Sequence, residues 1–205
     1  MSQAALVCAR SAVLFWDLPT AITMVAIAGA ESNWNREAGG DSPAQLEAAG
    51  AYESAKRARE WNCPTGSDHG PSSWGYWQIN VGWNHDFLVP MSGFRDPCWI
   101  ASWLKIGSNN ARAANVILGR QGFDAWTVYR HNIHLNYIDE ATSAVHQARW
   151  ELEYHWGIWP IDEGGDPIVD FDDSKYISTL SGINPIVLTL LAGAGIYGVY
   201  YAVKN

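Results

Sequence analysis

An acidic residue closes a long apolar stretch near the start of the chain. Glu31 follows "TAITMVAIAGA", which contains no charged residue from Thr20 to Ala30. Because this segment is apolar on every face, the pattern predicts a buried helix over about 20–30, with Thr20 as its N-cap. Burial and the negative end of the helix dipole both favour the protonated form of a carboxyl group at the end of such a helix. A carboxylic acid that stays protonated near neutral pH is what general acid cleavage of a glycosidic bond requires.

A second stretch carries two amide side chains in a pattern suited to sugars. In "SSWGYWQIN", residues 72–80, Gln78 and Asn80 stand two positions apart, which puts them on the same face of a short extended segment. Amides donate and accept hydrogen bonds and so match sugar hydroxyl and N-acetyl groups. Tyr76 and Trp77 supply flat apolar area for stacking or for core packing. The stretch is therefore a candidate glycan-binding segment.

The two stretches together resemble the lysozyme-like lytic transglycosylases, the family grouped with goose-type lysozymes in glycoside hydrolase family 23. "AIAGAESNWN" is similar to the family's segment with a catalytic Glu followed by Ser, here Glu31 and Ser32. "GYWQIN" is similar to its Gly-Leu-Met-Gln-Ile motif, with Asn80 next, as in many phage members. "NARAANVILGRQGFDAWTVYRHNIHLNYIDEA" resembles the phage form, and Tyr129 matches the family's active-site tyrosine. The resemblance covers roughly residues 1–142, although "RHN" after Tyr129 departs from the family's Tyr-Asn-Ala-Gly.

The resemblance implies cleavage of the β-1,4 bond between N-acetylmuramic acid and N-acetylglucosamine in peptidoglycan. Glu31 would protonate the leaving oxygen and then act as the base on the C6 hydroxyl of the muramic acid, which closes onto C1 and leaves a 1,6-anhydro product. The family requires no metal and no cofactor. The resemblance assigns substrate binding to Ser32, Tyr76, Gln78, Asn80 and Tyr129.

The segment between the two motifs keeps a hydrolytic alternative open. It contains several acids, of which Asp41 and Asp68 are predicted to lie in loops. If one of them holds a water molecule near the anomeric carbon, the enzyme is a hydrolytic muramidase, that is, a lysozyme. The identity of the product separates the two reactions.

Composition and periodicity predict a mainly helical globular domain. The chain has 205 residues, of which 48% are hydrophobic and 12 are Trp, so either a Trp-rich core or an aromatic groove is expected. The only strand-like content that stands out is "WGYWQINVG". The predicted class is α+β, mainly α: a lysozyme-like domain with a small β segment, followed by a C-terminal transmembrane helix. Helices are expected over about 3–15, 20–30, 44–60, 98–120, 124–130 and 134–155.

The predicted domains are a lysozyme-like transglycosylase domain over 1–159, an acidic linker over 160–182 and a membrane anchor over 183–205. Residues 186–203 carry no charge and no proline, a length at the lower limit for a membrane span. The alternative is a buried hairpin helix. Lipid is therefore an expected partner through 186–203, together with peptidoglycan strands and other virion proteins.

Charge and cysteine content exclude other classes of protein. The formal net charge is -8 and the chain has no basic stripe, so nucleic acid is not an expected partner. His131 and His134 are three apart without a third ligand, and we expect no metal site. The cysteines Cys8, Cys63 and Cys98 are interpreted as buried thiols, with a Cys63–Cys98 disulfide as the alternative.

The predicted architecture indicates a biological setting. A peptidoglycan-cleaving domain on an acidic tether with a membrane span resembles the virion-associated transglycosylases of membrane-containing phages, which open the cell wall locally during host entry. The expected location is therefore the virion membrane, with the bacterial cell membrane as the alternative. A structural virion protein with an inactive lysozyme-like fold, or a cell-encoded tethered autolysin, are the competing interpretations.

Overall fold

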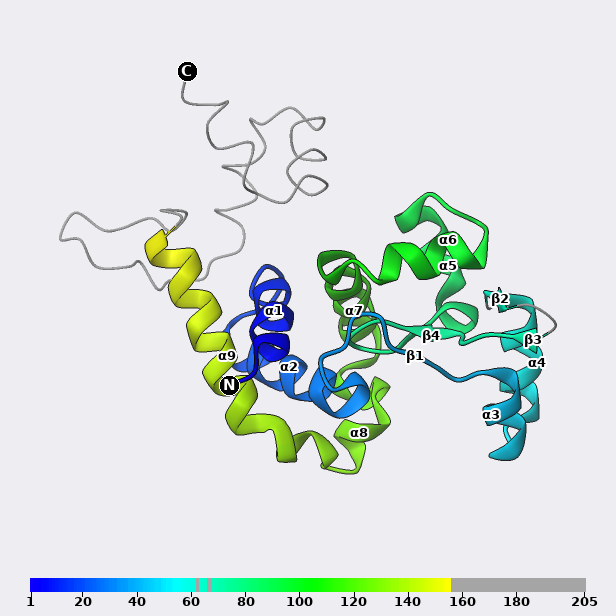
Figure 1. The fold of residues 1–205 in the computed structure, drawn as a ribbon, viewed down its shortest axis with the longest axis horizontal. Helices are drawn as coiled ribbons and strands as arrows, with labels where there is room; N and C mark the ends of the chain where they lie inside the picture. The colour runs from blue at the N-terminus through cyan, green and yellow to red at the C-terminus, as the bar shows by residue number, and fades with distance from the viewer. Residues whose placement is uncertain (62, 66–67, 156–205) are drawn as a thin grey trace, which may run out of the picture. The chain divides into compact units, whose positions relative to one another are not determined.

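The computed structural model describes residues 1–61, 63–65 and 68–155, all of which belong to the compact unit Met1–Ile158 (Figure 1). The predicted linker and membrane anchor lie outside the described residues. Within the described part of the chain, no helix combines the length and the apolar character that a membrane span needs. The unit is mainly helical with a small antiparallel sheet, as the sequence predicted. Its main helices are α1 (Gln3–Ala12), α2 (Leu18–Ser32), α3 (Pro43–Ala48), α4 (Tyr52–Trp61), α5 (Val81–Ser92), α6 (Pro97–Leu104), α7 (Gly107–Gln121), α8 (Thr127–Arg130) and α9 (Ile138–Trp150).

The remaining elements are short. Three two-residue strands form one sheet in the order β1 (Gly39–Gly40), β4 (Ser73–Trp74), β5 (Ile79–Asn80), and β2 (Pro64–Thr65) pairs with β3 (Asp68–His69) in a separate hairpin. Helical turns η1 (Phe123–Ala125) and η2 (Ile133–Tyr137) flank α8, and the π-helical turn η3 (Glu151–His155) follows α9. Because every strand is so short, packing between helices and not the sheet forms the core.

Helix α2 is the central element, as its apolar sequence predicted. It packs against α1, α9 and η2, and its residues from Met24 to Gly29 are buried. The predicted N-cap was wrong: the helix begins at Leu18 because the Asp17 side chain accepts a hydrogen bond from the backbone N–H of Thr20. Pro19 suits this first turn, where a backbone N–H has no helical partner.

The end of α2 is fixed by close packing. A Cβ atom on Gly29 would lie 2.7 Å from the Tyr137 ring and 2.8 Å from the Trp34 ring, so only glycine allows both rings to approach the helix. The Trp34 indole N–H donates to the carbonyl of Val25 at 2.8 Å. Asn33 follows the helix in the left-handed conformation with φ 52°, which ends the helix directly after Ser32. These contacts hold Glu31, the penultimate residue of the helix, in a fixed position.

Tryptophan side chains fill the interior, which confirms one of the two roles predicted for them. Trp16, Trp34, Trp77 and Trp126 are each less than 8% exposed. Each of these indole N–H groups has a hydrogen-bond acceptor, as burial of a polar atom requires. Trp16 and Trp77 pack edge to face with ring centroids 5.2 Å apart.

The predicted strand segment forms a tight hairpin instead of a continuous strand. Residues 75–78 turn the chain between β4 and β5, with Gly75 at φ 81° and Gln78 at φ 47°. Asn110 of α7 is fully buried beneath this turn, where its Oδ1 accepts from the N–H of Trp77 at 3.1 Å and its Nδ2 donates to the carbonyl of Trp74 at 3.0 Å. A Cβ atom on Gly75 would collide with Nδ2 of Asn110, so glycine is required here by both conformation and space.

The segment between the motifs contains two helices where one was predicted. Gly50, with φ 75°, separates α3 from α4, and Ser42 and Gln45 form a capping box at the start of α3. Cys63 and Cys98 form a disulfide, so the prediction of three free thiols was wrong and only Cys8 fits it, as a fully buried thiol. The disulfide joins the chain after α4 to the start of α6.

We predict that Asn110→Ala lowers the free energy of unfolding by about 2 to 4 kcal/mol, because it removes two buried hydrogen bonds and leaves a cavity under the turn. Asn109→Ala is the matched control on the same helix, since its side chain makes a single bond to the Trp103 carbonyl at 3.1 Å. It is expected to cost less than about 1 kcal/mol. Chemical denaturation of both variants measures this, and equal losses would contradict the assigned role of Asn110.

Candidate active site

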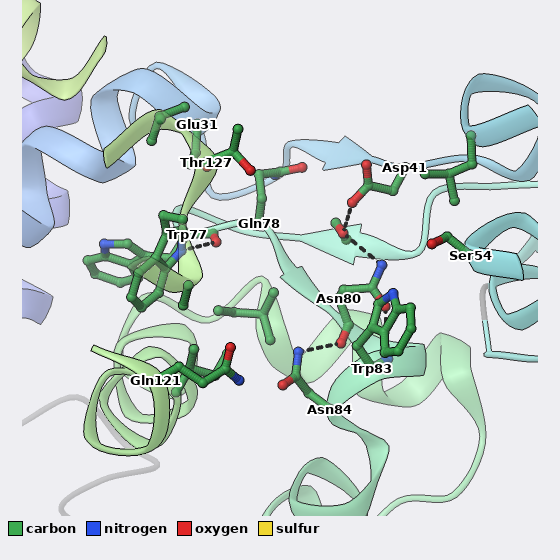
Figure 2. Close-up of a pocket in the computed structure, with 17 residues that line it drawn as sticks. Glu31, Asp41, Ser54, Trp77, Gln78, Asn80, Trp83, Asn84, Gln121 and Thr127 are labelled. Carbon is green, nitrogen blue, oxygen red and sulfur yellow. Dashed lines mark hydrogen bonds between the residues drawn. The ribbon is translucent and has the colours of Figure 1, made fainter. Parts of the chain in front are cut away.

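A groove of about 600 Å³ opens at the end of α2 and is the candidate active site (Figure 2). Its walls come from the end of α2, the β1 region, the β4–β5 hairpin, the first turn of α5, the end of α7 and the η1–α8 segment. A groove of this size accommodates a ligand as large as a short glycan. The lining residues are Glu31, Asp41, Leu46, Ser54, Ser73, Trp77, Gln78, Ile79, Asn80, Trp83, Asn84, Ile117, Gln121, Ala125, Trp126, Thr127 and Val128.

Glu31 is a half-buried carboxyl group in the wall of this groove. Burial raises its pKa from 4.5 to about 7, and the negative charge of Asp41 adds to the shift. Among the described residues, none forms a hydrogen bond or an ion pair with the Glu31 carboxyl group, so nothing offsets the loss of hydration. The prediction of a raised pKa is confirmed, and Asp41 adds a cause that the sequence did not indicate.

Gln78 lies in the groove with a fixed orientation. Its Nε2 donates to the carbonyls of Gly75 at 2.9 Å and Ala38 at 3.2 Å. A Cβ atom on Gly40 would lie 2.6 Å from Oε1 of Gln78, so β1 leaves room for the amide only because residue 40 is glycine. Within the described chain no donor reaches Oε1, which leaves this oxygen as an acceptor for a ligand N–H or O–H group.

Asn80 lines the groove, but its amide forms hydrogen bonds with other residues of the protein. The Oδ1 atom caps α5 by accepting from the N–H of Trp83 at 3.0 Å, and Nδ2 donates to the hydroxyl groups of Ser72 and Ser73, each at 3.2 Å. The Ser73 hydroxyl in turn donates to the Asp41 carboxylate, as the dashed lines in Figure 2 show. Asn80 therefore positions Asp41 through Ser73. A direct contact of Asn80 with substrate stays a prediction.

Three other predicted site residues do not line the groove. Ser32 donates from its hydroxyl to the carbonyls of Ala28 and Tyr76, both at 2.9 Å, and so ties α2 to the hairpin turn. Tyr76 is 2% exposed, and burial is the main cause that raises the pKa of its hydroxyl group. The Tyr129 ring is half-buried between Phe123 and His134, with ring centroids 5.0 and 4.7 Å away. Their assignment to substrate binding stays a prediction that rests on the resemblance.

Several groove residues were not among the predicted site residues. Trp83 in the first turn of α5 is 53% exposed, and the Arg57 guanidinium lies 4.2 Å from its ring centroid. Asn84, Gln121 and Thr127 add polar groups, and Ser54 comes from α4. The sequence could have indicated Trp83, because it stands three positions after Asn80 and an aromatic ring next to a polar segment is suited to stacking on a sugar.

The remaining candidates from the sequence have other roles. Asp68 belongs to the β2–β3 hairpin, and the described structure does not extend to its side chain. His134 is buried and stacks on Tyr129, whereas His131 is exposed. Over the residues that the structure describes, no group of three His, Cys, Asp or Glu side chains has a geometry that could hold a metal ion.

Comparisons with family models, with curated proteins and with solved structures found no match to this chain. The chemistry of the groove therefore carries the functional argument. It combines a carboxyl group of raised pKa with a second carboxylate and an amide oxygen free to accept, on a wall that also carries tryptophan. This set can donate a proton to a neutral polyhydroxylated ligand and hold it by hydrogen bonds.

The unpartnered Glu31 is expected to make stability depend on pH. Because its pKa is raised in the folded state, the folded protein holds this proton more tightly than the unfolded chain, so stability falls as pH rises from about 4.5 through about 7. Glu31→Gln removes this ionisation and is predicted to be more stable than the wild type at pH 8, by on the order of 2 to 3 kcal/mol, and equal to it at pH 4. Urea denaturation of both proteins from pH 4 to 8 measures the difference. A constant difference across this range would contradict the assignment.

Proposed function

We propose that the protein is a peptidoglycan lytic transglycosylase in which Glu31 is the catalytic acid and base. The observation that carries the proposal is the unpartnered, half-buried Glu31 carboxyl group, with its pKa near 7, in the wall of a groove that also contains Gln78. The resemblance of the two sequence motifs to the lysozyme-like transglycosylases points in the same direction.

One carboxyl group is sufficient for this reaction. Glu31 donates its proton to the glycosidic oxygen as the bond from that oxygen to C1 of the muramic acid breaks. The C6 hydroxyl oxygen then bonds to C1, and its proton passes to Glu31, which restores the protonated acid. The products are a 1,6-anhydro-muramic end and a new free hydroxyl end, and no water is consumed. Oε1 of Gln78 can accept the N–H of an N-acetyl group and so orient the sugar.

A second candidate reaction is hydrolysis, because Asp41 lines the same groove as Glu31. The Asp41 side chain accepts a hydrogen bond from Ser73, which fixes the carboxylate at the groove wall. A carboxylate placed there can take a proton from water as the water oxygen attacks C1, while Glu31 protonates the leaving group. The chain would then be a muramidase that forms reducing ends.

The proposed setting is a phage virion membrane, to which residues 186–203 anchor the enzyme for local opening of the cell wall during host entry. The bacterial cell membrane is the alternative location, with the protein as a tethered autolysin. A structural virion protein without activity is the alternative from another class. Detection of the protein in purified particles tests the setting separately from the chemistry.

The first prediction concerns the products. The full chain in a mild detergent is expected to release fragments with anhydro-muramic ends from purified peptidoglycan, and Glu31→Gln to lose at least about a thousandfold in rate, since it cannot donate the proton. Mass spectrometry of the fragments measures both. Reducing ends that disappear in Asp41→Asn would establish the hydrolase, whereas intact glycan with a folded wild-type protein would favour the structural interpretation.

The second prediction concerns pH. Because Glu31 must be protonated, kcat/KM is expected to fall above about pH 7 as this group ionises. Asp41→Asn removes a charge that raises the pKa of Glu31 and is expected to move this fall to lower pH, by less than the effect of burial because burial is the larger cause. Asp139→Asn, an exposed position on α9 with the same change of charge, is the matched control. Identical pH profiles for all three proteins would contradict the coupling of Asp41 to Glu31.

A further inference from the structure

A second cavity lies beyond Trp83, between α4 and the start of α5. Its volume is about 210 Å³, and Trp83 lines both this cavity and the groove that contains Glu31. Figure 2 shows Trp83 on the other side of the view from Glu31, and of the residues that line the groove only Trp83 also lines the second cavity. Its other lining residues are Glu53, Lys56, Arg57 and Glu60.

These four charged residues share one face of α4, since they are spaced three, four and seven positions from Glu53. Helical neighbours of opposite charge at this spacing often pair, yet no ion pair joins any of the four to another described residue. Arg57 lies over the Trp83 ring, and Lys56 is exposed. Two carboxylates and two cations, all on exposed residues, therefore line one small cavity without a direct ion pair between them.

The two cavities differ in the chemistry that they offer. Among the described residues, acids, amides, hydroxyl groups and apolar side chains line the groove and no Lys or Arg does, which suits an uncharged sugar. The side cavity offers both signs of charge within one face of a helix, which suits a ligand that carries carboxylate and ammonium groups together. A glycan with a zwitterionic substituent matches the lining of both cavities.

We propose that the cavity lined by Glu53, Lys56, Arg57 and Glu60 binds the peptide that substitutes the glycan strand. The inference rests on the proposed function, because peptidoglycan carries short peptides with free carboxylates and, at a diamino acid, a free amine. Lys56 and Arg57 bind the peptide carboxylates, and Glu53 and Glu60 bind the ammonium group. Trp83 separates the peptide from the sugars. The enzyme therefore acts preferentially on peptide-substituted strands.

Binding to the full chain tests this inference without any need for turnover. Isothermal titration calorimetry is run with the disaccharide N-acetylglucosaminyl-N-acetylmuramic acid, with the same disaccharide bearing a tetrapeptide that contains a diamino acid, and with that peptide acetylated on its free amine. The wild type is expected to bind the peptide-bearing probe about tenfold more tightly than the bare disaccharide. Acetylation is expected to weaken binding about fivefold, because it removes the charged partner of two exposed carboxylates that act together.

The variants assign the contacts. Glu53→Gln/Glu60→Gln is expected to bind the peptide-bearing probe about fivefold more weakly than the wild type does and to be insensitive to acetylation, which identifies the acids as partners of the amine. Arg59 on the same helix pairs with Glu47 instead of lining the cavity. Arg59→Gln is therefore the matched control, and its affinity for all three probes is expected to be unchanged. Melting temperatures establish that each variant is folded.

The outcomes separate the inference from the proposed function. Equal affinities of the wild type for bare and peptide-bearing probes, or equal sensitivity of the double variant and the wild type to acetylation, would overturn the peptide site. If peptide binding is as expected but purified peptidoglycan is not cleaved, the peptide site stands and the proposed function fails. Cleavage at the same rate before and after enzymatic removal of the peptides would leave the proposed function and overturn the peptide preference.

Discussion

The fully buried side chain of Trp77 fixes the two walls of the groove relative to each other. Its indole N–H donates to the carbonyl of Met24 at 2.7 Å, which joins the hairpin turn to α2. Its own carbonyl accepts from the indole of Trp126 at 3.0 Å, and its N–H donates to Asn110. Because all these groups are buried, each broken bond would leave an unsatisfied polar atom, so the turn has one stable position. Gln78 follows directly and is therefore held at a constant place relative to the end of α2.

Much of the fold followed from local sequence patterns. The apolar stretch before Glu31 predicted α2 because a helix without a polar face has to be buried. The single helix predicted over about 98–120 was wrong in its continuity, because α6 ends at Leu104 and α7 begins at Gly107. Helix α5 was missed because Gly82 and Pro90 weaken its helical pattern, and packing and the Asn80 cap decide in its favour. The segment between the motifs forms α3 and α4 instead of one helix because Gly50 adopts the left-handed conformation. The helix-favouring composition of the segment gave no indication of this break.

The sequence predicted several residues of the candidate site but not how their side chains are arranged around the groove. Glu31 and Gln78 line one groove, as the motifs indicated, because Glu31 lies in the last turn of the buried helix α2 and Gln78 in the tight turn that is packed on it. Tyr76 points into the core, since the alternation of faces that places side chains on a strand ends where the chain turns at Gly75. The approach of Asp41 to Glu31 depends on the pairing of β1 with β4, a contact between distant segments that no local pattern contains.

The disulfide between Cys63 and Cys98 constrains the wall of the groove that carries Trp83 and not the wall that carries Glu31. It closes a loop of 35 residues that contains the β4–β5 hairpin and α5, and chain-entropy arguments put the effect of such a loop at about 4 kcal/mol through restriction of the unfolded chain. Helix α2 and its glutamate lie outside this loop. Reduction would therefore remove a covalent constraint from the segment that carries Trp83, whereas the segment that carries the acid has no such constraint to lose.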